Sequence, residues 1–338
     1  MVFYASNFRT ALKILKMIRR ATLGIGVAVC DLAGSSFAQD YPNRPVRLIV
    51  PFLAGGGVDA ASRIVAQKLS EVLGQQIVVE NRPGASGTIG ATAVAKAAPD
   101  GYTLLAGPGD LITMPAMLPK TSYDPINDLV PVTMVSSNPL VVVASANAPF
   151  ATMAELTAAA RARPGDIGYA TPGNGTFNHV IAEWMSSAAG IKLQHIPYRG
   201  GAAAANGIAA GDVPLGVLSP PAIQGLLDIG RVKVLALTGK NRPPFVPAHW
   251  PTLMEAGLPV DGTFWVGLFA PIGTPPEIVA RLERDMARVL RDDAVRKRMQ
   301  DIGLEANAAG QAALVERIRS ETARYDRIIR DAGIRGDN

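Results

Sequence analysis

The apolar run Val46-Arg-Leu-Ile-Val50 leads directly into Pro51-Phe-Leu-Ala-Gly-Gly-Gly-Val-Asp-Ala60. From Ala61 to Val72, apolar side chains then recur every three or four residues, and Gly74 ends the pattern. The stretch therefore predicts a strand, a glycine turn and an amphipathic helix. A helix that begins in this way points unpaired backbone N–H groups and the positive end of its dipole at the turn, so we expect an anion site there.

Short apolar runs and helical patterns alternate along the rest of the chain, which favours an α/β fold with a largely parallel sheet. The last third differs, because it reads as charged helices over residues 276–303 and 311–332. Strands are expected at residues 46–50, 77–79, 103–106, 140–144, 167–170, 193–196, 213–218, 234–237 and 264–269.

A second glycine loop, Thr171-Pro-Gly-Asn-Gly-Thr-Phe-Asn178, also stands between an expected strand and an expected helix. Two such loops suggest one anion-facing loop in each of two domains. The length agrees, because 338 residues exceed the size at which a single hydrophobic core usually stops growing.

The N-terminus reads as a secretory signal peptide. Residues 1–20 carry basic side chains and no acidic one, residues 21–29 are mostly apolar, and Ser36 and Ala38 are small residues at the spacing of a cleavage site. We therefore expect cleavage near Ala38 and a product in the periplasm.

Three points about this leader stay open. Met17 begins a more ordinary signal sequence than Met1 does. The Arg19-Arg20 pair permits twin-arginine export as well as Sec export, and Cys30 permits a lipoprotein interpretation in which Val29 is a poor preceding residue.

Cleavage changes the composition of the product. Removing residues 1–38 takes away five of the 33 basic residues and one of the 28 acidic residues, so the formal charge of +5 belongs mostly to the leader. A nearly neutral product argues against a nucleic-acid partner. The single cysteine, Cys30, also lies in the leader, so we expect neither a disulfide nor a thiol nucleophile.

Catalytic and cofactor motifs find little support. Gly55, Gly57 and Ala60 match the spacing of a dinucleotide fingerprint, with Glu80 at the end of the next strand, but three adjacent glycines satisfy that spacing easily and an exported protein meets little nicotinamide cofactor. The segment Gly84-Ala-Ser-Gly87 is one residue short of a nucleophile elbow.

The three histidines show no zinc-binding spacing, and neither glycine loop has the lysine of a phosphate-binding P-loop. We expect no metal, no cofactor and no enzymatic activity.

The motifs of this chain and their order resemble those of a known family, the Bug or TctC-like receptors of tripartite tricarboxylate transport systems. The similarity runs in order through residues 41–335 and is specific as a set. It is carried by residues 41–59, 78–90, 98–105, 171–175 with His179, 197–200, 210–213 and 265–275.

The resemblance implies a type II periplasmic-binding-protein-like fold, in which two α/β domains are joined by a hinge and enclose the ligand in the cleft between them. The domains would be residues 39–144 plus 265–338 and residues 145–264, after a signal peptide at 1–38. It also implies that loop amides, hydroxyls and water hold the carboxylate. The ligand-binding residues it implies are Phe52, Ala54, Gly55, Gly56, Gly57, Asp59, Ala85, Ser86, Gly87, Thr88, Thr171, Asn174, Gly175, Thr176, His179, Tyr198 and Ser219.

Several of these residues also have a purely structural interpretation. Asp59 is placed to cap its helix, which we favour over ligand contact. Ser86, Thr88, Thr176 and Asn174 are equally suited to capping, and His179 is more often a helix-start residue than a ligand. The remaining structural interpretations are Tyr198 as core, Arg199 as a surface residue, and Trp184 and Trp265 as core.

The sequence also departs from the family pattern. Ala54 replaces a common proline, Phe177 replaces a small or polar residue, and Leu218-Ser-Pro-Pro221 replaces a phenylalanine-aspartate pattern. The last two changes make the cleft less polar and favour a ligand with an apolar or aromatic body over citrate.

The resulting hypothesis is a monomeric periplasmic receptor that captures a small organic carboxylate and delivers it to the membrane subunits of a tripartite transporter. Two alternatives are a ligand sensor and, with less support, a secreted enzyme that acts on a carboxylate.

Overall fold

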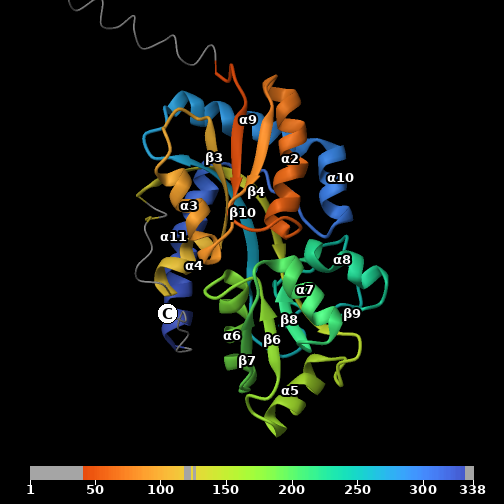
Figure 1. Cartoon of the computed structure of the whole chain (residues 1–338). Coiled ribbons are helices and arrows are strands. Elements are labelled where there is room, and N and C mark those ends of the chain that lie inside the picture. Colours follow the sequence, from red (N-terminus) through yellow and green to blue (C-terminus); the bar gives the residue numbers. More distant parts are fainter. Residues whose placement is uncertain (1–40, 118–122, 125–126, 332–338) are drawn as a thin grey trace, which may run out of the picture. The chain divides into compact units, whose positions relative to one another are not determined.

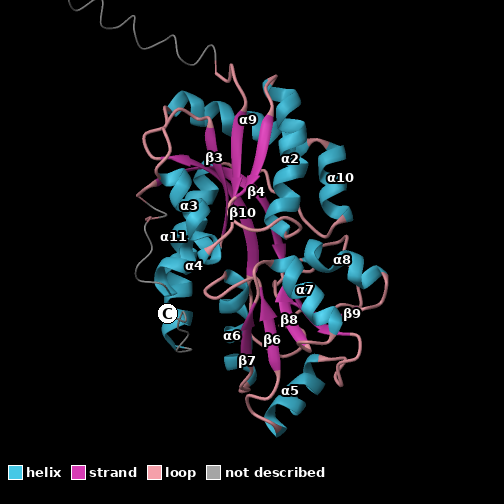
Figure 2. Ribbon diagram, in the orientation of Figure 1, coloured by secondary structure: helices cyan, strands magenta, loops and turns pink. Residues whose placement is uncertain are grey.

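The computed structural model describes residues 41–117, 123–124 and 127–331, so the expected signal peptide lies outside the described residues. Residues Arg44–Asn338 form one compact unit, and the fold below is the fold of that unit. Its described part contains two five-stranded sheets covered by helices (Figures 1 and 2). We refer to each sheet and the helices packed on it as the first and the second lobe.

The first sheet has the strand order β2-β1-β3-β10-β4. The strand β1 (Val46–Val50) runs parallel to both β2 (Ile77–Asn81) and β3 (Thr103–Pro108). The strand β10 (Thr263–Pro271) runs antiparallel to β3 and to β4 (Leu129–Pro139).

The second sheet repeats this plan with the order β7-β6-β8-β5-β9. Here β6 (Gly168–Thr171) runs parallel to β7 (Gln194–Pro197) and β8 (Leu215–Leu218). The strand β5 (Val141–Ser145) runs antiparallel to β8 and to β9 (Val232–Leu237). The expectation of a largely parallel sheet was thus only partly right, because each sheet also contains antiparallel pairs. A strand buried on both faces reads as a continuous apolar run whatever its direction, so the pattern cannot distinguish the two cases.

All nine expected strands are present, but β4 was missed. Its sequence includes Pro131 and the polar segment Ser136-Ser-Asn138, which interrupt the apolar run. The strand β4 ends at Pro139 in the first sheet, and β5 begins at Val141 in the second. Residues 141–144, which the sequence analysis assigned to the first domain, therefore pair within the second sheet.

Two expected helices cover the C-terminal third, and the structure divides the first of them. The Asp292 carboxylate accepts hydrogen bonds from the Ala294 and Val295 amides at 3.0 and 3.2 Å and so begins a new helix. The helices are α2 (Gly57–Leu73), α3 (Thr88–Ala95), α4 (Asp110–Met117), α5 (Met153–Ala162), α6 (Phe177–Ala189), α7 (Gly201–Ala210), α8 (Pro220–Asp228), α9 (Pro276–Arg291), α10 (Asp293–Asp301) and α11 (Gln311–Asp331), with a 3-10 turn, η1, at Ala85–Gly87. Among the helices searched within the described ranges, none combines the length and apolar character needed to cross a membrane.

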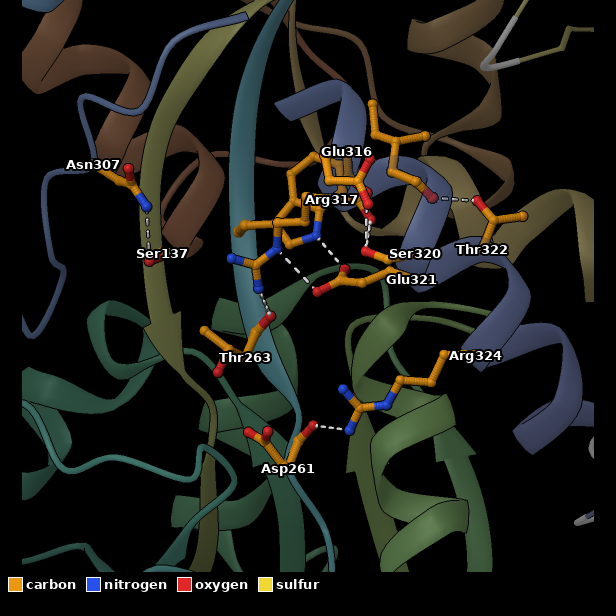
Figure 3. A network of polar contacts seen from close by, with 12 residues as sticks. Ser137, Asp261, Thr263, Asn307, Glu316, Arg317, Ser320, Glu321, Thr322 and Arg324 are labelled. Atoms are coloured by element: carbon orange, nitrogen blue, oxygen red, sulfur yellow. Dashed lines mark hydrogen bonds and ion pairs between the residues drawn. The ribbon is translucent and has the colours of Figure 1, made fainter. Parts of the chain in front are cut away.

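The helix α11 braces the segment in which the chain returns to the first lobe (Figure 3). The Arg317 guanidinium donates to the Thr263 carbonyl at 3.0 Å, and Arg324 donates to the Asp261 carbonyl. The buried Glu321 carboxylate accepts from Arg317 at 2.9 Å and from the indole N–H of Trp265 at 2.6 Å. The expected core position of Trp265 is confirmed, since its side chain is fully buried.

Trp184 on α6, which was also expected in the core, is only half-buried, and the Arg324 guanidinium lies 4.9 Å from its ring centroid. A cation over an aromatic face is attractive, so Arg324 joins α11 to the second lobe as well as to the returning segment.

We expect Glu321→Ala to lower the free energy of unfolding by about 2–3 kcal/mol, because it leaves a buried indole N–H and a largely buried guanidinium without their acceptor. Chemical denaturation would measure the change. The matched control is Glu316→Ala on an exposed face of α11, for which we expect a change within about 0.5 kcal/mol. Equal effects of the two substitutions would contradict the assigned role of Glu321.

Candidate functional site

A cavity lies between the two lobes, at the ends of strands from both sheets. Its volume is about 30 Å³, and no lysine, arginine or histidine is among the described residues that line it. The first lobe contributes Phe52, Gly56, Gly57, Val58, Asp59, Asp110 and Phe264, and the second contributes Pro172, Asn178, Gly201 and Ser219.

The start of α2 opens into this cavity. Its N-cap, Gly56, provides no side-chain acceptor, so the amides of the first turn, Gly57 to Asp59, lack the intrahelical partners that later residues have. Glycine is required at position 57 for a steric reason, because a Cβ there would lie 2.8 Å from the Ser219 hydroxyl oxygen. The two lobes therefore approach each other within contact distance beside these amides.

A second helix start, that of α7, faces the same cavity from the other lobe. Its N-cap is Gly200, again without a side-chain acceptor, and Gly201 lines the cavity. A Cβ on Gly201 would lie 4.0 Å from the Gly56 Cα, so the first turns of α2 and α7 converge. Sequence analysis missed this helix start, although Pro197-Tyr-Arg-Gly-Gly201 shows the same signal of glycines between a strand and a helix.

The Asp59 carboxylate is committed to holding the first loop. It accepts hydrogen bonds from Arg63 at 3.0 Å, from Asn81 at 2.9 Å and from the Gly55 amide at 3.1 Å. Burial pushes the pKa of Asp59 upward, but these hydrogen bonds outweigh burial and hold the pKa below its usual value. The expectation that Asp59 caps its helix was wrong, because Gly56 is the N-cap and Asp59 instead holds the Gly55 amide of the loop.

The start of α6, which follows the second expected anion-facing loop, is occupied by a side chain of the first lobe. The Phe177 amide donates to Asp110 Oδ1 at 3.0 Å, and the Thr113 hydroxyl donates to the Gly175 carbonyl at 3.3 Å. Asp110 is 4% exposed, and burial raises its pKa to about 7 although the Phe177 amide opposes the rise. Asp110 was not predicted, but Gly107-Pro-Gly-Asp110 is a further glycine loop after a strand and could have been noticed.

Three residues that the family resemblance implied as ligand contacts, His179, Thr171 and Thr176, make hydrogen bonds to backbone groups of the Thr171–Thr176 loop. The ring of His179 is 5% exposed, accepts from the Gly175 amide through Nδ1 at 3.2 Å and stacks on His195 with centroids 3.8 Å apart. Thr171 and Thr176 both donate to the Gly173 carbonyl, at 3.0 and 2.8 Å. None of these side chains lines a described cavity, so their ligand contacts stay a prediction without geometric support here.

An adjoining cavity shares Phe52 and Pro172 with the first. It contains the expected residues Ala85, Ser86, Gly87, Asn174 and Tyr198, together with Arg199, which is exposed as expected but faces this cavity.

Two features of this adjoining cavity are typical of a functional site. Ala85 and Ser86 have φ angles of 44° and 51°, a left-handed conformation that costs free energy in residues other than glycine. The Oδ1 atom of Asn174 is buried and finds no hydrogen-bond partner among the described residues.

The remaining expected residues lie outside both cavities. The Thr88 hydroxyl donates to the Ala85 carbonyl at 2.9 Å, and Ala54 is exposed. The ring of Phe177 is fully buried against Phe264 and Tyr325, with centroids 5.8 and 5.1 Å away. The expectation that Phe177 makes the cleft less polar was therefore wrong, because its ring packs into the core.

Within the residues searched, no cluster of histidine, cysteine and carboxylate side chains is arranged to hold a metal ion.

Comparison with known proteins adds to this geometry. Residues 61–334 match the family described as "Tripartite tricarboxylate transporter family receptor". The protein BugT of Bordetella pertussis is 35% identical over 319 residues, which cover 93% of this chain and 95% of BugT.

Two solved structures of similar proteins contain ligands. The Rhodopseudomonas palustris protein Rpa4515 with adipate has a TM-score of 0.85 and 34% identity, covering 88% of this chain and 99% of that one. MatC from the same species, with bound malate, has a TM-score of 0.80 and 31% identity, covering 86% and 100%. The expected two-lobed binding-protein fold is confirmed by these structures.

The buried His179 predicts a pH-dependent stability. Burial, assisted by the neighbouring His195, lowers the pKa of His179 to about 3. The unfolded chain, with a histidine pKa near 6.5, therefore binds the proton more readily, and stability is complete above about pH 6.5 and falls as the pH decreases from there towards 3, by up to about 1.4 kcal/mol per pH unit.

The measurement is the free energy of unfolding between pH 7 and pH 5. We expect His179→Asn, which keeps an acceptor for the Gly175 amide, to show a shallower pH dependence than the wild type. The control is His249→Asn at an exposed position, which should keep the wild-type slope. A slope that is unchanged in His179→Asn would contradict this assignment.

Proposed function

Because the chain belongs to the tripartite tricarboxylate transporter receptor family, whose members are periplasmic solute-binding proteins, we propose that it captures a small organic carboxylate between its two lobes and delivers it to the membrane subunits of such a transporter. The lobes would close over the ligand about the two chain crossings, as hinge proteins do. The protein would act as a monomer that binds its ligand without transforming it.

The observation that carries the proposal is the convergence of two uncapped helix starts on one cavity. The first-turn amides of α2, beginning at Gly57, and of α7, beginning at Gly201, provide donors and two positive dipole ends. A carboxylate is one of the anionic groups that fit such a site. The absence of a basic side chain among the described lining residues agrees with recognition by amides, which need no buried counter-charge.

The other walls favour a small ligand with a partly apolar body. Phe52 and Phe264 provide aromatic surface, and the helix α8 adds no amide donor at its first two positions, because Pro220 and Pro221 lack an N–H group. The adjoining cavity provides room for the part of the ligand that extends away from the bound carboxylate. Similar proteins with adipate and malate support a carboxylate as the ligand class.

A thermal-shift screen of mono-, di- and tricarboxylates, aliphatic and aromatic, tests the ligand class. A carboxylate at about 100 times its Kd should stabilise the fold by about 2.7 kcal/mol, since binding to the folded state alone shifts the folding equilibrium. Sugars and amines of similar size are the controls. Stabilisation by a sugar or an amine, with no response to any carboxylate, would refute the proposal.

Gly56→Leu should abolish binding without unfolding the protein. A Cβ at position 56 meets no atom within 4 Å, so the residue fits the fold while its side chain fills the cavity in front of the α2 amides. The matched control is Gly225→Leu, also with open space around its Cβ but on α8 outside both cavities, which should bind normally. Calorimetry with the strongest carboxylate of the screen measures both variants, and undiminished binding by Gly56→Leu would remove the site from this cavity.

A further inference from the structure

The cavity is electrostatically asymmetric. Donors gather where α2 and α7 begin, whereas Asp110 lines the cavity and its carboxylate accepts from the Phe177 amide at the start of α6. Asp110 is the first residue of α4, and it reaches across the cleft to bind the Phe177 amide of the other lobe. A ligand therefore meets amide donors at one place and a buried acid at another.

No basic side chain among the described residues neutralises the Asp110 carboxylate. No ion pair to Asp110 is formed by the described residues, and no basic side chain is among those that line the cavity. Arg63, on the helix that follows the first loop, is already bonded to Asp59 and Asn81. Among the described residues across the cleft, the Phe177 amide is thus the partner of the Asp110 carboxylate. A hydrogen bond from an amide does not neutralise the charge of a carboxylate.

A second carboxylate of a ligand finds fewer free amide donors at the start of α6 than at the starts of α2 and α7. The Phe177 amide is taken by Asp110 itself, the His179 amide is capped by the Thr176 hydroxyl, and α8 begins with two prolines. Above the Asp110 pKa of about 7, a ligand carboxylate at this position would face an ionised carboxylate directly. A ligand hydroxyl or ammonium group could instead donate to the carboxylate oxygens, which only accept while they are ionised.

We propose that Asp110 selects among carboxylate ligands, favouring those that carry a hydroxyl or ammonium donor over analogues that lack one. This inference rests on the proposed function, since it concerns the specificity of the same cavity. The physical basis is that a buried acceptor placed to receive a hydrogen bond from the ligand is left unsatisfied, or faces a like charge, when the donor is missing. Sites of this kind discriminate more strongly than apolar pockets do.

Matched ligand pairs test the preference in the wild-type protein. The pairs are propionate and lactate, succinate and malate, glutarate and 2-hydroxyglutarate, and phenylacetate and mandelate, which differ within each pair by one hydroxyl group. Isothermal titration calorimetry at pH 8 should give at least tenfold tighter binding for the hydroxylated member of the pair that binds best. Equal affinities within that pair, or tighter binding of the member without the hydroxyl, would overturn the proposal without any variant.

Substitutions then assign the preference to Asp110. Asp110→Asn keeps the side-chain size and an acceptor for the Phe177 amide but removes the charge, and we expect the preference to fall below threefold. Thr113→Val is the control, because it removes the other hydrogen bond from α4 to the second lobe, to the Gly175 carbonyl, at a residue that does not line the cavity. That variant should keep the wild-type preference.

The outcomes separate this inference from the proposed function. Carboxylates that bind without a hydroxyl preference, or a preference that persists in Asp110→Asn, overturn the role of Asp110 and leave the receptor assignment standing. A loss of preference in Thr113→Val equal to that in Asp110→Asn also overturns it, since both effects would then come from loosened contact between the lobes. If no carboxylate of the full screen binds, both proposals fall together.

Discussion

The two lobes are held together by two chain crossings, and one side chain is bonded to both. The Thr238 hydroxyl accepts from the Leu140 amide at 2.9 Å and donates to the Gly262 carbonyl. The Thr238 backbone is bonded to the same two residues, at 3.0 and 2.8 Å. The helix α11 then holds the second crossing from outside through Arg317 and Arg324. Because these contacts fix where each sheet begins, they bring the loops at the strand ends of both sheets into one cleft, where ligands bind in open α/β folds.

The sequence predicted the part of the fold that depends on local pattern. The run Val46–Val50, the three glycines and the periodic helix after them are confirmed as β1, a turn and α2, because burial, backbone freedom and helical spacing all leave a mark within a few residues. The direction of β5 and β10 depends on which lobe the chain comes from, and the strand β4 contains polar residues that are buried by long-range pairing. Neither the direction of these strands nor the burial of the polar residues in β4 can be predicted from a local sequence pattern.

Site prediction was limited in a different way. Glycine loops before helices mark where anions can bind, but they do not say whether the amides are free. At α2 the Asp59 side chain turns back to the loop and leaves the first-turn amides open, whereas at α6 the Asp110 side chain of the other lobe fills the corresponding position. His179 illustrates the same limit, since it lies in the first turn of α6 beside the expected loop, and its ring Nδ1 accepts from the Gly175 amide. A family resemblance transfers the position of a loop more safely than the role of each residue in it.

Four helix starts meet at the cleft, and their different states define what the cleft can hold. Those of α2 and α7 are open and lie side by side, so together they form one anion site rather than two. That of α6 already holds the acid of Asp110, and that of α8 begins with prolines. A ligand with an anionic group at each of the four helix starts would lack donors at two of them. The prolines of α8 have no N–H group, and the Phe177 amide of α6 is already bonded to Asp110. The cleft is therefore built for one principal carboxylate, and the rest of the ligand must satisfy aromatic walls and an acceptor, which places specificity in the groups the ligand carries besides its charge.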